Sequence, residues 1–360
     1  MSGLFGSAGA ASSANTVGDL KNDVAVANLP EDGITSLAFN PNPADQKDFM
    51  AVASWDKKVR IYEVDTNSGQ AVGRAAYDHT GPVFSVQVFK DGVNVVSGGA
   101  DNQARLMDLN TQQTRQVAQH EKPIRTVRCV EINGQPMLIT GSWDKTIKYW
   151  DLRTANHVAE KVCPERIYSM DSRDNMLVTA TAERIITVMD IRQPQADFYK
   201  KHQSPLKWQT RVVSCFTDAS GYAIGSIEGR CAIQYVEDKD SSSNFSFKCH
   251  RDPPSNNSTN VYSVNDISFH PEHGTFSTAG SDGTFHFWDK DAKHRLKGYP
   301  NVGGPITATN FNRNGRIFAY AISYDWSKGY QANNQQQPIK LMLHPVQPDE
   351  CKPRPSAKKR

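Results

Sequence analysis

The chain repeats one pattern of residues seven times, and this repeat limits its possible folds more than any other feature. The clearest copy, residues 141–152, reads GSWDKTIKYWDL. Each copy has small residues, then an acidic turn residue, then a strand-like run. The steps between successive acidic residues are 45, 43, 39, 45, 54 and 43 residues. These acidic residues are Asp56, Asp101, Asp144, Glu183, Glu228, Asp282 and Asp325.

A period near 40–45 residues, with small residues before the acid and a Trp-Asp-like pair after it, is the WD-repeat signature. One such repeat is a four-stranded sheet, and a single sheet cannot bury both of its faces. Seven sheets in a ring bury one another and leave only short edges. The repeat therefore predicts an all-β fold, a seven-bladed WD40 β-propeller that forms one domain over residues 23–346.

Alternating apolar residues within each repeat predict where its strands lie. In the third repeat we expect strands at residues 124–130, 137–141 and 146–152. The inner strands of the other repeats should begin near Ile34, Val83, Ile167, Val212, Tyr262 and Ile306.

The last repeat lacks an outer strand of its own. It ends with a strand-like run at residues 339–343, and residues 23–29, ahead of the first repeat, are also strand-like. Pairing these two runs would remove an exposed edge that invites aggregation. We therefore expect the N-terminal strand to close the last blade.

Three segments are expected to lie outside the blades. Residues 1–22 are rich in Gly, Ala and Ser and are predicted to be disordered. Residues 238–260 are a long polar insertion that explains the 54-residue step. Residues 347–360 form a C-terminal tail that ends in basic residues.

Composition excludes several classes of function. The net charge of +3 over 360 residues is too small to indicate nucleic-acid binding by itself. No run approaches the ~18 apolar residues of a membrane span, and none resembles a secretory signal. The six cysteines are scattered and form no Cys-x-x-Cys pair. We expect no metal, no cofactor, no membrane span and a reducing compartment.

One constellation looks catalytic, because His120, Thr140, Asp144 and Trp150 supply a hydroxyl, a base and an acid. In WD repeats these positions match a hydrogen-bonded tetrad that ties one blade together. A degraded copy occurs in the second repeat, where Met107 stands in place of the Trp. A catalytic set would occur once, so we interpret the constellation as structural and expect no catalytic residues and no enzyme.

The turns that hold the acidic residues should gather on one rim of the ring. Five of the seven carry a cation just after the acid, which would suit an acidic partner segment. Asp-Lys turns are also common in WD repeats generally, so an ordinary solvated surface is the alternative. The candidate partner-binding residues are Lys57, Lys145, Arg184, Arg230 and Lys328.

A second cluster combines aromatic residues with cations, at residues 245–251 and 288–293. This mixture suits single-stranded nucleic acid, through base stacking and phosphate attraction. The alternative is that Phe247 and Trp288 belong to the blade core. The candidate nucleic-acid-binding residues are Phe247, Lys248, Arg251, Trp288, Lys290 and Lys293.

Several segments carry a family resemblance. The chain resembles the nuclear-pore mRNA export factors of the WD-repeat class over roughly residues 23–345. A sister family, the mitotic-checkpoint propellers that carry kinetochore kinases, also resembles this chain at residues 226–230 and 247–251. The residues at 288–291 and 324–328 favour the export factors. The motifs that carry the resemblance lie at residues 180–184, 225–230, 247–251, 280–283, 287–292 and 323–329.

The resemblance implies a non-enzymatic adaptor for mRNA export. Its partner would be the acidic GLEBS hairpin of a nucleoporin, and Arg230 matches the arginine that grips the glutamates of that hairpin. The family also binds RNA, here expected to be weak, single-stranded and largely charge-driven, and Lys293 stands where the family more often has arginine. The resemblance further implies a monomer or a heterodimer with the nucleoporin. It places the protein in the nucleus at the pore complex of the nuclear envelope, with some in the cytoplasm. The alternative function is a spindle-checkpoint scaffold that binds a GLEBS-like hairpin of checkpoint kinases.

Overall fold

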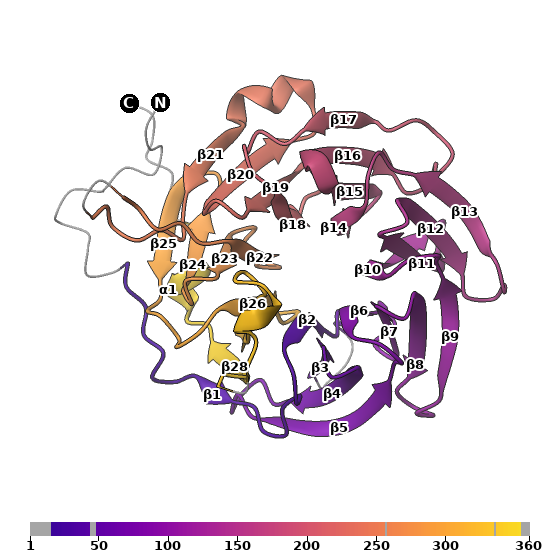
Figure 1. Ribbon diagram of the computed structural model, residues 1–360, viewed down its shortest axis with the longest axis horizontal. Coiled ribbons are helices and arrows are strands. Elements are labelled where there is room, and N and C mark those ends of the chain that lie inside the picture. Colours follow the sequence, from indigo (N-terminus) through magenta and orange to yellow (C-terminus); the bar gives the residue numbers. More distant parts are fainter. Residues whose placement is uncertain (1–15, 44–47, 256–257, 335, 354–360) are drawn as a thin grey trace.

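Seven antiparallel sheets of four strands form a closed ring, as the computed structural model in Figure 1 shows. The structure describes residues 16–43, 48–255, 258–334 and 336–353. The predicted fold class, a seven-bladed WD40 β-propeller, is confirmed.

The inner strand of each blade lines a central channel. The inner strands begin where the repeat predicts, except in the fifth and sixth blades, where each boundary is displaced by two residues. They are β2 (Ile34–Phe39), β6 (Val83–Val88), β10 (Ile124–Ile132), β14 (Ile167–Arg173), β18 (Thr210–Cys215), β22 (Val264–Phe269) and β26 (Ile306–Phe311).

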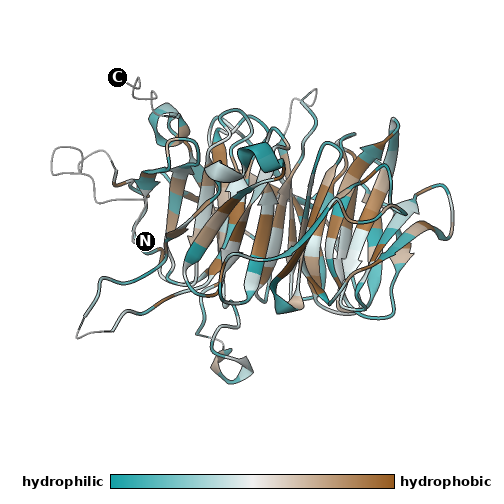
Figure 2. Cartoon of the chain, turned by 90° about the horizontal axis from the view of Figure 1, so that it is seen from above, coloured by the Kyte–Doolittle hydropathy of each residue, from teal (hydrophilic) through white to brown (hydrophobic). Residues whose placement is uncertain are grey.

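The second strand of a blade is covered on both faces, because neighbouring blades pack against it. In the fourth, fifth, sixth and seventh blades every residue of this strand is buried. Figure 2 accordingly shows apolar residues concentrated in the strands and polar residues in the loops. The second strands are β3 (Asp48–Ser54), β7 (Asn94–Gly99), β11 (Gln135–Ser142), β15 (Met176–Thr181), β19 (Gly221–Ser226), β23 (Phe276–Gly280) and β27 (Ile317–Ile322).

The third strand returns through the turn that holds the acidic residue, so all seven acid turns lie on one face of the ring. We call this the acid-turn face. The third strands are β4 (Lys58–Val64), β8 (Gln103–Asp108), β12 (Thr146–Asp151), β16 (Ile185–Asp190), β20 (Arg230–Tyr235), β24 (Phe285–Asp289) and β28 (Lys340–Pro345).

The outer strands form the perimeter and are more exposed. The polar segment expected at residues 238–260 is corrected here, because its middle forms the outer strand of the fifth blade. Only its flanks, including the 3-10 turn η3 (Asp238–Ser243), lie outside the sheet. The outer strands are β5 (Ala71–Asp78), β9 (Thr114–Gln119), β13 (His157–Val162), β17 (Lys200–Gln203), β21 (Phe245–Lys248), β25 (His294–Gly298) and β1 (Val24–Ala25).

The N-terminal strand closes the seventh blade, as predicted. β1 pairs antiparallel with β28, with Val24 opposite Leu343 and Ala25 opposite Met342. The ladder continues through the Val26 N–H, which donates to the Leu341 carbonyl at 2.9 Å. The first and last strands of the ring, β1 and β28, therefore lie side by side, which is visible in Figure 1.

Both ends of the folded domain lie further out than the sequence predicted. Residues 16–22 follow the outer strand β25, where the Gly18 N–H donates to the Gly298 carbonyl at 2.9 Å and Leu20 packs against the core. At the other end, the short helix α1 (Pro348–Cys351) buries Cys351. The predicted disordered segment and basic tail therefore each contribute residues to the fold. Residues 1–15 and 354–360 lie outside the described residues.

A buried cluster joins the two ends of the chain. The His344 ring on β28 contacts the Asp23 carboxylate at 2.6 Å and the Glu350 carboxylate at 3.1 Å. Burial opposes a charge on this ring, but the two hydrogen bonds outweigh burial and raise the pKa of His344 to about 9. Asp23 also accepts a hydrogen bond from Tyr320. We call Asp23, His344 and Glu350 the closing clasp.

Candidate partner-binding face

The residue directly after each turn acid has a left-handed backbone. In five of the seven turns the acid stabilises this conformation by accepting the N–H of the residue two positions on, as Asp56 does from Lys58 at 3.1 Å and Asp144 does from Thr146 at 2.9 Å. The seven left-handed residues, all with φ between 62° and 73°, are Lys57, Asn102, Lys145, Arg184, Gly229, Gly283 and Trp326.

Four of the five predicted partner-binding cations lie apart from one another around the acid-turn face. Lys57 and Lys328 are exposed. Lys145 forms an ion pair with Glu165 of the next blade. The Arg184 guanidinium donates to a backbone carbonyl at 2.9 Å. Of these four, Lys57 and Lys328 have side chains with the greatest freedom to meet a partner.

The fifth cation, Arg230, belongs to a compact cluster in the fifth blade. Arg230 begins β20 and stands directly opposite Lys248, the last residue of β21. Arg251 follows and donates to the carbonyls of Glu228 at 2.5 Å and Gly229 at 3.2 Å. Burial, and then the charge of Arg230, lowers the pKa of Arg251. We call Arg230, Lys248 and Arg251 the blade-five cluster, which joins residues predicted for two separate sites.

Phe247 and Trp288, expected to stack on nucleic acid, lie instead in the core between the fifth and sixth blades. Their exposed fractions are 2% and 4%, and their ring centroids are 4.6 Å apart. The Trp288 indole N–H donates to the Thr278 hydroxyl at 2.9 Å. The interpretation of these two residues as blade core, which the sequence left open, agrees with the structure.

Trp288 completes a second tetrad that the sequence did not reveal. The His250 Nδ1 atom lies 2.9 Å from an Asp282 carboxylate oxygen, and its Nε2 atom lies 2.9 Å from the Thr278 hydroxyl oxygen. The predicted tetrad of the third blade has the same form, with His120 2.8 Å from Asp144. The separation of His and Asp is 32 residues in the sixth blade and 24 in the third, and this difference hid the second tetrad.

Lys290 and Lys293 lie on the face opposite the acid turns. β24 starts next to the acid turn of its blade and ends at Asp289, so the following turn lies at the far face. Lys290 pairs with Asp291 at 2.8 Å and lies 5.0 Å above the Phe216 ring, while Lys293 lies 4.9 Å above an aromatic ring of β21. The structure therefore divides the predicted nucleic-acid groove between the two faces.

An arc of aromatic side chains crosses four adjoining blades on the acid-turn face. The ring centroids of Trp326 and Trp55 are 4.5 Å apart, and those of Trp55 and Phe84 are 5.5 Å apart. The centroids of Phe84 and Trp143 are 5.6 Å apart. A cavity of about 400 Å³ opens beside Trp326. The sequence signal was present but unused, since all three tryptophans adjoin a turn acid. We call these four residues the aromatic arc.

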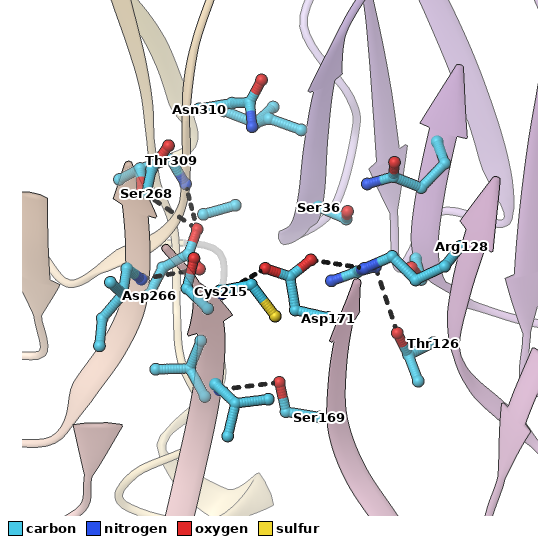
Figure 3. A pocket seen from close by; sticks show the side chains of 18 of the residues that line it. Ser36, Thr126, Arg128, Ser169, Asp171, Cys215, Asp266, Ser268, Thr309 and Asn310 are labelled. Atoms are coloured by element: carbon cyan, nitrogen blue, oxygen red, sulfur yellow. Dashed lines mark hydrogen bonds and ion pairs between the residues drawn. The ribbon is translucent and has the colours of Figure 1, made fainter. Parts of the chain in front are cut away.

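The central channel holds a polar cavity of about 310 Å³, shown in Figure 3. In this cavity side chains of one inner strand bond the backbone of the next. Asp171 accepts the Cys215 N–H at 2.7 Å and pairs with Arg128 at 2.9 Å. Burial raises the pKa of Asp266 to about 6, although hydrogen bonds from the backbone and side chain of Thr309 oppose this. These contacts join blades that share no backbone ladder.

The family model described as "WD domain, G-beta repeat" matches residues 26–63, 74–108, 111–151 and 244–289. Within the part of the chain that the structure describes, no helix is long and apolar enough to span a bilayer, and no group of three His, Cys, Asp or Glu side chains is placed to hold a metal.

Relatives similar to this chain cover almost all of its length. The "mRNA export factor GLE2" of Chaetomium thermophilum is 67% identical over 360 residues, which is all of both chains. The "Poly(A)+ RNA export protein" of Schizosaccharomyces pombe is 56% identical over 98% of each chain. "Protein Rae1" of Drosophila melanogaster is 43% identical over 92% of this chain and 96% of its own. The chain belongs to the family of WD-repeat mRNA export factors.

Proposed function

We propose that this protein is a non-enzymatic adaptor for mRNA export at the nuclear pore, and that its acid-turn face binds the acidic GLEBS hairpin of a nucleoporin. The observation that carries the proposal is the blade-five cluster. Two arginines and a lysine share one blade edge there, and Arg230 faces Lys248 directly across the ladder. Like charges placed opposite each other destabilise a sheet unless an anion relieves them.

The aromatic arc supports a partner that is partly apolar. Interface anchors are enriched in Trp, Tyr and Arg, and this face presents both tryptophan and arginine. A hairpin that places apolar residues on the arc and glutamates at the blade-five cluster would use both surfaces. Arginine suits this role because its planar fork binds a carboxylate through two hydrogen bonds.

The export role rests on the relatives, two of which are named for RNA export. It implies residence in the nucleus and at the nuclear envelope, with some protein in the cytoplasm. The spindle-checkpoint scaffold, which residues 226–230 and 247–251 also allow, is not favoured by these relatives.

Titration with a GLEBS peptide tests the partner site. Arg230→Ala should weaken binding by about 2–5 kcal/mol, because the partner carboxylate would remain buried without its cation. Arg192→Ala is the matched control, since Arg192 pairs with Asp190 at the end of a third strand, on the opposite face. Equal affinities for Arg230→Ala and wild type would exclude Arg230 as an anchor.

RNA contact, in this proposal, is weak and driven by charge. Phe247 and Trp288 are buried, so stacking on them does not contribute. Each phosphate contact should add about 0.7 to the slope of log affinity against log salt for single strands. We expect a slope equivalent to a few contacts, reduced by Lys248→Glu more than by Lys239→Glu, a reversal in the exposed turn η3. Anisotropy across salt, with and without the hairpin, measures this, and no binding at low salt in either state would remove RNA from the proposal.

A further inference from the structure

The seven inner strands share one irregularity at the mouth of the central channel. In every blade the register between the first two strands shifts at the second residue of the inner strand. In the third blade this bulge lies beside the pair Ile124 and Ser142, next to the acid turn. The seven bulged residues all line the channel cavity, and they are Thr35, Phe84, Arg125, Tyr168, Arg211, Asn265 and Thr307.

Four of these seven bulged residues already contact other residues of the protein through their side chains. Thr35 donates to a carbonyl of the next blade at 2.6 Å. Asn265 does the same at 2.9 Å, and Thr307 bonds a serine hydroxyl at 2.9 Å. Phe84 belongs to the aromatic arc.

The other three members come from three consecutive blades and retain donors without acceptors. Arg125 makes one hydrogen bond, to the Phe84 carbonyl at 3.3 Å, and Arg211 makes one, to the Asp325 carbonyl at 3.1 Å. Among the described residues, neither guanidinium has a carboxylate within ion-pair distance, and the Tyr168 hydroxyl has no hydrogen-bond partner. We call Arg125, Tyr168 and Arg211 the mouth trio.

The two guanidinium groups of the mouth trio also repel each other. Burial, and then the charge of Arg211, lowers the pKa of Arg125 to about 10. Each arginine can offer four further N–H donors. The charge of Asp266 acts on Arg125 and that of Asp325 acts on Arg211, but neither carboxylate is within ion-pair distance. Two positive charges beside unused donors suit an anion that carries two negative charges.

We infer that the mouth trio binds a doubly charged oxyanion of the phosphate class, either free or as a phosphoryl group carried by a partner chain. Two arginine forks and a phenolic hydroxyl supply donors to a tetrahedral oxyanion from three sides. Asp171 and Asp266 also line this cavity, and Asp171 is already paired with Arg128. The trio shares no residue with the blade-five cluster, so this inference does not require the proposed GLEBS site.

Calorimetric titration of the full chain with inorganic phosphate tests the inference. The titration is done at pH 8, where phosphate is doubly charged, and chloride holds the ionic strength constant. We expect saturable binding to wild type, and a dissociation constant raised about tenfold or more in the double variant Arg125→Gln/Arg211→Gln, since hydrogen bonds to charged groups are lost. Arg153→Gln is the control, because Arg153 pairs with Asp151 at the end of β12, on the opposite face.

Two further measurements identify the source of the anion and test whether each variant is folded. Tighter binding of N-acetyl-phosphoserine amide than of inorganic phosphate would identify a phosphoryl group on a partner chain, and the reverse order would identify a free anion. The melting temperature of each variant in chloride reports on folding. If the double variant does not fold, the single variant Arg211→Lys, which keeps the charge and loses the fork, should bind more weakly than wild type. No saturable binding of either probe to wild type, or unchanged affinity in a folded variant, would overturn the inference.

Discussion

At the scale of single residues, the acid turns place large side chains in a backbone conformation that glycine adopts most easily. Gly229 and Gly283 meet this requirement without strain, and an added Cβ on Gly283 would lie 2.7 Å from a backbone oxygen. Lys57, Arg184 and Trp326 hold the same conformation at a cost of about 1–2 kcal/mol each. Exposed side chains that keep this strain are candidates for binding a partner.

Replacing Lys57 separates stability from binding. Lys57 is exposed and its φ is 71°. Lys57→Gly should leave the free energy of unfolding unchanged or raise it by up to about 1 kcal/mol, because the strain is relieved. It should also weaken GLEBS binding, because the cation is removed. Urea unfolding and peptide titration measure the two effects, and a destabilised Lys57→Gly protein would contradict the strain argument.

At the scale of elements, the tetrad ties the strands of a blade through one threonine. A carboxylate only accepts, so His120 donates from Nδ1 to Asp144, and its Nε2 is hydrogen-bonded to the Thr140 hydroxyl at 2.7 Å. The Thr140 oxygen then accepts the Trp150 indole N–H at 2.8 Å. Every polar group in this buried cluster has a partner.

Thr140→Val should destabilise the protein strongly while keeping the shape of the side chain. The change leaves the His120 Nε2 and the Trp150 N–H buried without partners, at a cost of about 2–4 kcal/mol. Thr114→Val, at an exposed position of β9, should change stability by less than about 0.5 kcal/mol. Denaturant unfolding of the two variants gives the comparison, and equal midpoints would show that the tetrad contributes little.

The same elements show how far the sequence predicts the structure. The repeat located the blades and the closing strand because both follow from apolar periodicity and the acid register. It did not predict that Phe247 and Trp288 share a core, because which face of a strand is buried depends on the neighbouring blade. It also did not predict that Lys248 and Lys290 lie on opposite faces of the ring. The face on which a loop lies depends on the direction of the strand before it.

At the scale of the whole molecule, the closing clasp holds the ring shut through charge. The pKa of His344 is raised from 6.5 to about 9, so its stabilising effect is fully present below pH 6.5 and is lost as pH rises through about 9. The shift corresponds to about 3 kcal/mol. The first and last folded segments of the chain are thus joined by one titrating group.

His344→Gln should therefore flatten the pH dependence of stability above neutral pH. Wild type should lose stability between pH 7 and pH 9.5, whereas the variant should be less stable at pH 6 and change little over this range. Thermal melting across this range, with His157→Gln as a control at an exposed histidine, is the measurement. A parallel loss in His344→Gln and wild type would show that another group controls the transition.

The pairing of β1 with β28 also sets the order in which the ring is completed during synthesis. Val24 leaves the ribosome long before Leu343, yet the two are partners. At translation rates of about 5–20 residues per second, β1 waits on the order of 15–60 s for its partner. Throughout that interval the nascent protein is an open crescent, and it becomes a circle only when β28 is available to pair with β1.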